Sequence, residues 1–381
     1  MKLVLVQALR AFAALLVVVH HAQFETAALA IRTNLAFRPS TLLPWPVGVD
    51  VFFVISGFII VYASASLYGR PGGRRRFLAH RVARLVPLYW LLSAAYLAVA
   101  LAVPGLLTGE AGASGLDPAS IAASFLFWPM LRPDGTALPL YGLGWTLNCE
   151  MFFYAVFAIG IGWGRRAAVA WLVAALGLLV LSRAAFPDMP MPLAFWTSPI
   201  ILEFAFGAAL GLARAEGFRI GLPVRAMLCA GGLTLLMLVP EPSLALHPFV
   251  YGIPSALLVA AAALGHDPAS SGDDSPSLSV RAAAALGDAS YALYLVHPFV
   301  LRGTREALVR SGLGPVLGAW PSLGLMIGLA VLVSLAVYRL VERPLTRRAR
   351  RLLDPGPRER LGSEKALEAA VPHVPPRTKR I

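Results

Sequence analysis

The first apolar stretch of the chain, residues 3–22, contains an arginine and two histidines. Arg10 and His21 are separated by about three turns of an α-helix, so both side chains would project from one helical face. A charge inside an apolar span is costly unless it faces protein or a wet cavity, and this cost indicates a functional role. A snorkelling arginine with interfacial histidines is the structural alternative. We expect Arg10 and His21 to face one site, with His21 better aligned than His20.

The second apolar stretch carries a carboxylate and a small polar pair. Asp50 lies at its start, and Ser56 with Gly57 lies deeper in the span. Asp50 could orient a histidine such as His21. A Ser-Gly pair is more often a notch for close helix packing, although the serine could also bond within its own helix.

The fourth stretch carries a polar stripe. Thr146, Glu150 and Tyr154 recur at intervals of four residues, so a helix would place hydroxyl, carboxylate and phenol on one face. An acidic residue in an apolar helix should face the interior and find a partner, for which Arg10, His21 or a substrate hydroxyl are candidates. A purely structural, hydrogen-bonded carboxylate is the alternative.

The ninth stretch also carries a polar stripe. Ser290, Tyr294 and His297 would lie on one helical face, and Pro298 is expected to break or kink the helix.

A pair of arginines precedes the third stretch. Arg81 and Arg84 are one helical turn apart and follow a run of arginines. Guanidinium pairs suit a polyanionic, nucleotide-like ligand. A positive-inside anchor or contact with anionic lipid is the alternative.

The elements that must position these residues are membrane helices. With 58% hydrophobic and 14% charged residues among 381, the sequence predicts an all-α, polytopic membrane protein in one bundle. The net charge of +13 comes from arginines beside the spans and in the tail, so it is a topology signal and no nucleic-acid partner is expected. Cys149 and Cys229 lack metal or redox spacing, and no metal is expected. About ten spans are predicted, at residues 3–22, 47–64, 85–103, 143–163, 167–186, 196–213, 226–239, 248–264, 284–301 and 315–340.

The distribution of lysine and arginine between the loops predicts that both termini are cytoplasmic. Residues 1–350 form the predicted membrane domain, and residues 351–381 a basic, disordered tail. This orientation places His21, Asp50, Glu150 and His297 in the outer half of the membrane and the paired arginines at the cytoplasmic boundary.

Six groups of residues together resemble the ordered motif set of the membrane-bound acyltransferase-3 family. The resemblance runs from about residue 7 to residue 345, and residues 144–154 are most similar to members that O-acetylate bacterial exopolysaccharide. The groups are Arg10 with His21, residues 49–58, Arg81-x-x-Arg84-x-x-Pro87, residues 145–154, residues 290–297, and Glu342-Arg343-Pro344.

The resemblance implies transfer of an acyl group, usually acetyl from acetyl-CoA, to a hydroxyl of a cell-surface or lipid-linked polysaccharide at the bacterial cytoplasmic (inner) membrane. His21 would act as general base or as transient acyl carrier, and the sequence leaves both open. Membrane lipid and the machinery of polysaccharide synthesis or export are the other expected partners. The implied residues are Arg10, His21, Asp50 and Glu150 for catalysis, Ser56, Arg81 and Arg84 for acyl-CoA, and Trp145, Tyr154, Tyr294 and His297 for the acceptor.

Two other functions fit buried charge in a membrane protein. A secondary transporter or flippase of a glycan would use intramembrane arginine, glutamate and histidine as substrate or ion sites. The lack of a convincing internal repeat argues mildly against it. A scaffold within a polysaccharide-export complex is the third, weaker hypothesis.

Overall fold

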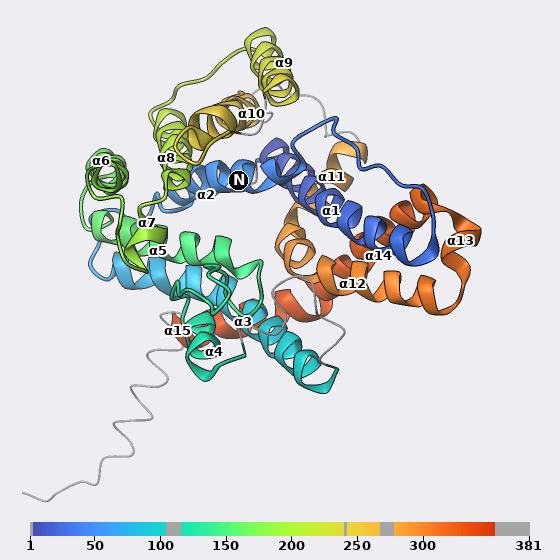
Figure 1. The fold of residues 1–381 in the computed structure, drawn as a ribbon. Coiled ribbons are helices and arrows are strands. Elements are labelled where there is room, and N and C mark those ends of the chain that lie inside the picture. Colours follow the sequence, from blue (N-terminus) through green and yellow to red (C-terminus); the bar gives the residue numbers. More distant parts are fainter. Residues whose placement is uncertain (1–2, 104–115, 240–241, 267–277, 355–381) are drawn as a thin grey trace, which may run out of the picture.

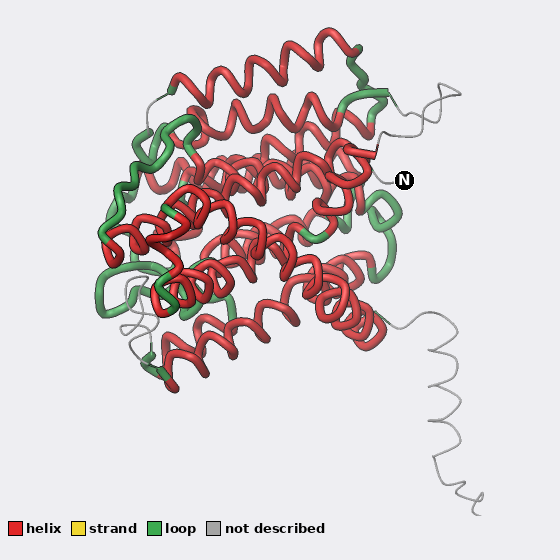
Figure 2. Tube along the Cα trace, turned by 90° about the vertical axis from the view of Figure 1, so that its right-hand side faces the viewer, coloured by secondary structure: helices red, strands yellow, loops and turns green. Residues whose placement is uncertain are grey.

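The computed structural model describes residues 3–103, 116–239, 242–266 and 278–354, and all regular structure in these residues is helical. Helices are the expected solution, because an apolar surrounding offers the backbone no outside hydrogen-bond partners. Most of the longer helices run in roughly the same direction, with loops gathered toward the two ends of the molecule (Figure 2). In chain order the elements are α1 (Val4–Thr33), η1 (Trp45–Val47), α2 (Gly48–Ala63), α3 (Gly73–Ala102), α4 (Pro118–Phe125), α5 (Gly144–Gly160), α6 (Arg165–Ala185), α7 (Leu193–Trp196), η2 (Pro199–Ile201), α8 (Leu202–Ala215), α9 (Leu222–Leu238), η3 (Pro248–Gly252), α10 (Ile253–Ala263), α11 (Leu278–Asp288), α12 (Ser290–Arg310), α13 (Leu313–Leu317), α14 (Ala319–Val337), η5 (Tyr338–Glu342) and α15 (Arg343–Leu353).

The helices are those of a membrane protein. Within the described residues, five helical stretches are long and apolar enough to cross a bilayer, and α9 and the η3–α10 stretch are shorter apolar helices. All ten predicted spans coincide with helical residues. The number that cross the bilayer and the side of each terminus stay predictions. The five long stretches are α1, η1 with α2, α3, α6, and α14 continued through α15.

Several boundaries differ from the sequence prediction. The first helix continues well past residue 22, to Thr33. The predicted span 284–301 is divided at Ala289 into α11 and α12. Pro298 does not end its helix, because α12 continues to Arg310. The predicted tail begins inside α15, and its residues after 354 lie outside the described part of the chain.

α1 borders much of the apolar core. It packs with α2 and α10 in one cluster and with α12 and α14 in another, while a third cluster joins α3, α5, α6 and α8 (Figure 1). α11 approaches α1 so closely that a Cβ on Gly287 would lie 1.8 Å from the carbonyl oxygen of Gln7. The middle of α1 is therefore enclosed by protein, which allows its polar side chains to face the interior.

α2 and α8 touch backbone to backbone. A Cβ on Gly57 would lie 2.1 Å from the carbonyl oxygen of Phe204, and a Cβ on Gly207 would lie 1.9 Å from that of Val54. Small residues permit such close approach between membrane helices. Gly57 is thus a packing notch, as expected for a Ser-Gly pair, and the contact fixes α2 against α8.

We expect Gly207→Ala to destabilise the protein, because the added methyl group would overlap the backbone of α2. Overpacking of this kind costs about 1–3 kcal/mol. Gly177→Ala is the control, since a Cβ on this α6 glycine meets nothing within 4 Å. Thermal unfolding in detergent should show a lower Tm for Gly207→Ala alone, and equal Tm values for the two variants would contradict the close-packing account.

Candidate active site

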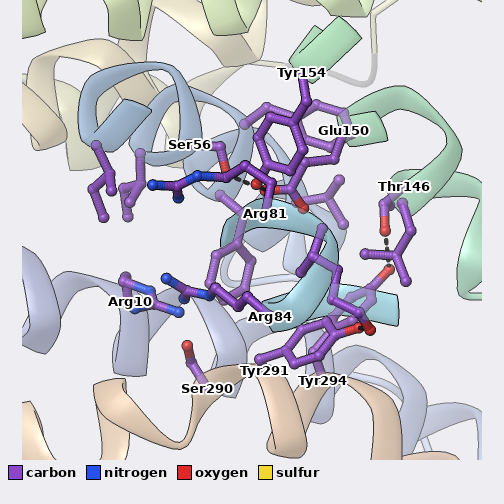
Figure 3. Close-up of a pocket in the computed structure, with 17 residues that line it drawn as sticks. Arg10, Ser56, Arg81, Arg84, Thr146, Glu150, Tyr154, Ser290, Tyr291 and Tyr294 are labelled. Atoms are coloured by element: carbon purple, nitrogen blue, oxygen red, sulfur yellow. Dashed lines mark hydrogen bonds between the residues drawn. The ribbon is translucent and has the colours of Figure 1, made fainter. Parts of the chain in front are cut away.

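A narrow cavity of about 80 Å³ lies between α1, α2, α3, α5 and α12. We call it the arginine cavity, because three guanidinium groups reach it from α1 and α3 (Figure 3). The three residues that the sequence analysis assigned to acyl-CoA all line it. Its polar lining residues are Arg10, Ser56, Arg81, Arg84, Thr146, Glu150, Tyr154, Ser290, Tyr291 and Tyr294.

The carboxylate of Glu150 is held by two hydroxyl groups. Ser56 Oγ donates to Glu150 Oε1 at 3.0 Å, and the Tyr154 hydroxyl donates to the same oxygen. Ser56 comes from α2, whereas Tyr154 lies one turn after Glu150 on α5. The two hydrogen bonds fix the carboxyl group of Glu150 between α2 and the next turn of α5.

The arginines are oriented by neutral groups. Arg10 Nη1 donates to Gln7 Oε1 at 3.1 Å, and the Arg81 guanidinium lies 5.6 Å from the Phe77 ring centre and 5.9 Å from that of Tyr154. In the described part of the chain, no Asp or Glu forms an ion pair with Arg10, Arg81 or Arg84. The cavity therefore presents guanidinium groups that are suited to an anionic ligand.

α5 and α12 close the cavity through a second set of hydroxyls. Thr146 Oγ1 and the Tyr294 hydroxyl lie 2.9 Å apart, and Tyr294 also donates to the carbonyl oxygen of Leu143 at 3.2 Å. The Tyr291 hydroxyl donates to the carbonyl oxygen of Leu85 on α3 at 2.7 Å. These contacts hold α12 against α3 and α5.

A second and larger cavity, of about 870 Å³, contains His21, and we call it the histidine cavity. Its volume is in the range of small-molecule sites. His21 Nδ1 lies 2.9 Å from the carbonyl oxygen of Val17. A carbonyl can only accept, so Nδ1 carries a proton. In a neutral imidazole bonded in this way, Nε2 is the nitrogen with the lone pair that can accept a proton. The other aromatic and polar lining residues include Tyr96, Asp134, Thr136, Tyr141, Trp145, Phe299, Arg302, Glu306 and Arg310.

The two cavities adjoin but are distinct. Trp145 lines the histidine cavity while the next residue, Thr146, lines the arginine cavity. His297 is buried near this boundary, with its ring centre 4.9 Å from that of His21 and 6.3 Å from that of Tyr294. Its Nδ1 is 3.0 Å from the carbonyl oxygen of Leu293. His297 thus lies between a residue of each cavity.

The expectation that Arg10 and His21 face one site is corrected here. Arg10 lines the arginine cavity and His21 lines the histidine cavity. Their shared helical face is no guarantee of a shared cavity, because three turns of helix also separate the residues by about 16 Å along the axis.

Asp50 lies beside a histidine, as suggested, but the histidine is His247 and not His21. Asp50 Oδ1 lies 3.2 Å from Nδ1 of His247, and Asp50 lines neither cavity. Asp50 faces α8 and η3, away from the Ser56 side of α2. The structure therefore gives Asp50 no place among the residues that line the candidate active site.

Several lining residues of the histidine cavity escaped the sequence analysis. Tyr141 donates from its hydroxyl to the carbonyl oxygen of Leu295 at 2.6 Å, which holds the loop before α5 against α12. Arg302 Nε donates to Glu25 Oε1 at 3.2 Å. A signal was present for this pair, since a charged residue on a helix of a membrane protein is expected to find a partner. Tyr141, in a loop, carried no such signal.

Comparison with known proteins decides the family. The profile described as "Acyltransferase domain" (Acyl_transf_3) matches residues 5–339. The chain belongs to the acyltransferase-3 family. It is an acyltransferase, and this supports the enzyme over the transporter or flippase.

Curated relatives agree with this assignment. The chain is 35% identical to "Exopolysaccharide production protein ExoZ" of Rhizobium meliloti (strain 1021), over 80% of this chain and 90% of that protein. It is 27% identical to "Acyltransferase MdmB" of Streptomyces mycarofaciens, over 67% and 68% of the two chains. It is 36% identical to "Protein 2 in picA locus" of Rhizobium radiobacter, over 36% of this chain and 76% of that protein. No solved structure matches the chain significantly.

We expect Glu150→Leu to destabilise this acyltransferase more than Glu150→Gln. Leucine would leave the hydroxyls of Ser56 and Tyr154 without their acceptor, at a cost of about 1–3 kcal/mol for each buried group. Glutamine keeps one acceptor oxygen. Thermal unfolding in detergent measures the difference, and a Glu150→Leu variant as stable as Glu150→Gln would show that these hydrogen bonds contribute nothing to stability.

Proposed function

We propose that the chain transfers an acyl group, acetyl in the usual case, from acyl-CoA to a hydroxyl of a cell-surface or lipid-linked polysaccharide. The observation that carries this proposal is the adjacency of the two cavities, one lined by three arginines and the other by a histidine with an available Nε2. The likeness to the exopolysaccharide production protein supports the class of acceptor.

The donor is assigned to the arginine cavity. Arg81 and Arg84 come from consecutive turns of α3 and share the cavity with Arg10. Guanidinium groups bind phosphate oxygens through paired hydrogen bonds, and a CoA thioester carries several phosphate groups. Because the cavity is narrow, we place only part of the donor within it. Ser56 and Tyr154 keep Glu150 bonded, which leaves the arginines available to the phosphates.

The acceptor is assigned to the histidine cavity. The rings of Tyr96, Tyr141, Trp145 and Phe299 offer flat apolar surfaces, and polar groups on the same walls can hold hydroxyls. His21 lines this cavity, so a bound acceptor can contact its imidazole. A sugar bound here would have a hydroxyl within reach of the imidazole, which suits the large volume of this cavity.

In the proposed reaction His21 acts as general base. Its Nε2 accepts the proton of the acceptor hydroxyl as the oxygen attacks the thioester carbonyl carbon. The new ester C–O bond forms, the C–S bond breaks, and the proton passes from the imidazole to the departing thiolate. Val17 holds Nδ1–H throughout, so the ring keeps the orientation needed for the proton transfer.

We place the enzyme in the bacterial cytoplasmic membrane, with the arginine cavity toward the inside and the histidine cavity toward the outside. The arginine-rich start of α3 supports this orientation by the positive-inside rule. In that arrangement an acyl group from the cytoplasm reaches an acceptor near the outer face. Association with the machinery of polysaccharide synthesis or export would bring the acceptor to this side.

His21→Asn is expected to lower acyl transfer by roughly 100- to 10,000-fold, because the general base is removed. His20→Asn is the matched control, since His20 lines neither cavity and packs its ring against Phe24 at 4.8 Å. Membranes with each variant are incubated with radiolabelled acetyl-CoA and glycan, and label in the glycan is counted. Wild-type transfer by His21→Asn would remove this residue from the chemistry.

Arg84→Gln is expected to raise the KM for the acyl donor by roughly 10- to 100-fold, because the variant loses a charge-assisted hydrogen bond to the donor. The KM for the acceptor should change little. Arg75→Gln, an exposed arginine on the same helix, serves as the control. A rise confined to the acceptor KM would contradict the placement of the donor in the arginine cavity.

A further inference from the structure

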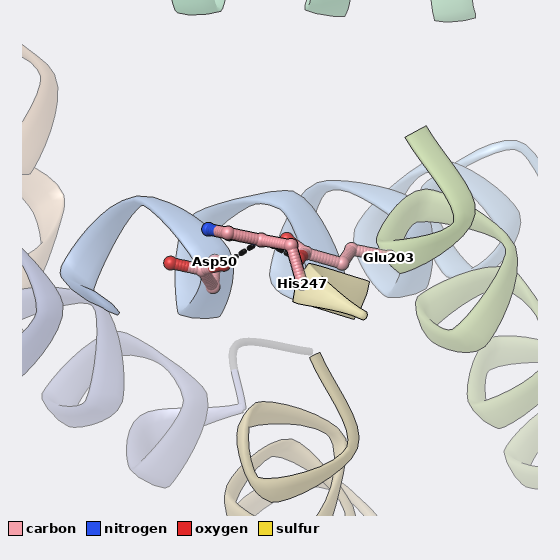
Figure 4. A group of neighbouring side chains, drawn as sticks. All are labelled: Asp50, Glu203 and His247. Carbon is pink, nitrogen blue, oxygen red and sulfur yellow. Dashed lines mark ion pairs between the residues drawn. The ribbon is translucent and has the colours of Figure 1, made fainter. Parts of the chain in front are cut away.

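Three side chains of types that can bind a metal ion meet outside both cavities, where α2, α8 and η3 begin. Asp50 lies in the first turn of α2, Glu203 in the first turn of α8, and His247 directly before η3. One donor atom from each residue lies within 4.8 Å of the other two. Figure 4 shows the three side chains turned toward one another. We call this group the Asp50 cluster.

Two of the three donor separations match a metal coordination sphere, and the third is within 4.8 Å. His247 Nδ1 lies 3.2 Å from Asp50 Oδ1 and 3.5 Å from Glu203 Oε1. Ligands at zinc bond lengths, placed at the corners of a tetrahedron, are about 3.3–3.6 Å apart. The side chains would therefore need little movement to hold an ion.

The cluster also lacks compensation for its charge. Asp50 is 3% exposed and Glu203 is fully buried. Apart from the ion-pair contacts of His247 with the two carboxylates, Asp50 Oδ1, both Glu203 oxygens and His247 Nδ1 have no hydrogen-bond partner. No Lys or Arg in the described part of the chain forms an ion pair with either carboxylate. One imidazolium could offset at most one of two buried negative charges, and an uncompensated buried charge is strongly unfavourable.

We propose that Asp50, Glu203 and His247 bind a divalent metal ion, with Zn²⁺ as the best fit to the donor set. Imidazole favours zinc-like ions and carboxylates accept them, whereas Ca²⁺ and Mg²⁺ prefer oxygen ligands alone. The backbone is shaped around the site, because a Cβ on Gly252 would lie 2.8 Å from Cγ of Glu203. The side chain of His247 is 23% exposed, which gives an ion a route in and leaves a coordination position for water.

The ion ties three helices together and takes no part in acyl transfer. None of its ligands lines the arginine or histidine cavity. Asp50 lies on the side of α2 that packs against α8, two turns before Gly57. A metal bond at the start of α2 would hold this helix in register with α8 and η3, and so hold Ser56 beside Glu150.

The test is metal content and thermal stability of the purified full-length protein in detergent. We expect about one Zn²⁺ per chain by elemental analysis, a fall in Tm of several degrees with EDTA, and recovery on adding ZnCl₂. His247 is the least buried of the three ligands, and His247→Gln should weaken Zn²⁺ binding by about 100-fold or more. Loss of a residue that only hydrogen-bonds to a metal ligand already lowers metal affinity by about 10- to 100-fold. Glu203→Gln should have the same effect.

Glu216→Gln is the matched control, because this exposed carboxylate lies just after the other end of α8 and is paired with Arg166. It should keep wild-type zinc content and EDTA response. The proposal is overturned if wild-type protein carries no metal and its Tm is unchanged by ZnCl₂ or MnCl₂, which would mean that the two carboxyl groups share a proton. It is also overturned by stabilisation with CaCl₂ alone, or by zinc content unchanged in His247→Gln.

Discussion

A charge in the low-dielectric interior of a membrane protein needs an opposite charge, hydrogen-bond donors or a polar cavity, and this requirement organises the buried polar residues here. Glu25 meets Arg302 and Arg305, and Glu150 receives two hydroxyl donors. The guanidinium groups of the arginine cavity have no such carboxylate partner among the described residues. That difference distinguishes a structural ion pair from a surface suited to an anionic ligand.

α2 links packing to the site. One side of this helix carries Gly57, which lets α8 approach at backbone distance, and the same side carries Asp50. Another side carries Ser56, which donates to Glu150 in the arginine cavity. α2 cannot slide along α8 without backbone overlap. The glycine contacts between these two helices therefore also fix the position of Ser56, which lies on another side of α2. Tight helix packing in this protein therefore serves the geometry of the cavity.

Local helical geometry predicted much of the candidate site. Glu150 and Tyr154 do share a face and hydrogen-bond to each other, because residues four apart on a helix are neighbours. The same reasoning failed for Arg10 and His21, since it described their angle around the helix and neglected the rise along it. The motif resemblance assigned Asp50 to catalysis, but its position on the α8 side of α2 places it outside both cavities.

The sequence by itself determined the membrane class, the family and the polar stripes on single helices, because composition, ordered motifs and helical periodicity are all local or additive properties. Only the tertiary structure decided which helices share a cavity, that Arg10 and His21 are divided between two, and that Asp50 meets Glu203 and His247. Those three ligands come from distant parts of the chain. Their meeting depends on how α2, α8 and η3 pack, and no spacing within the sequence encodes that arrangement.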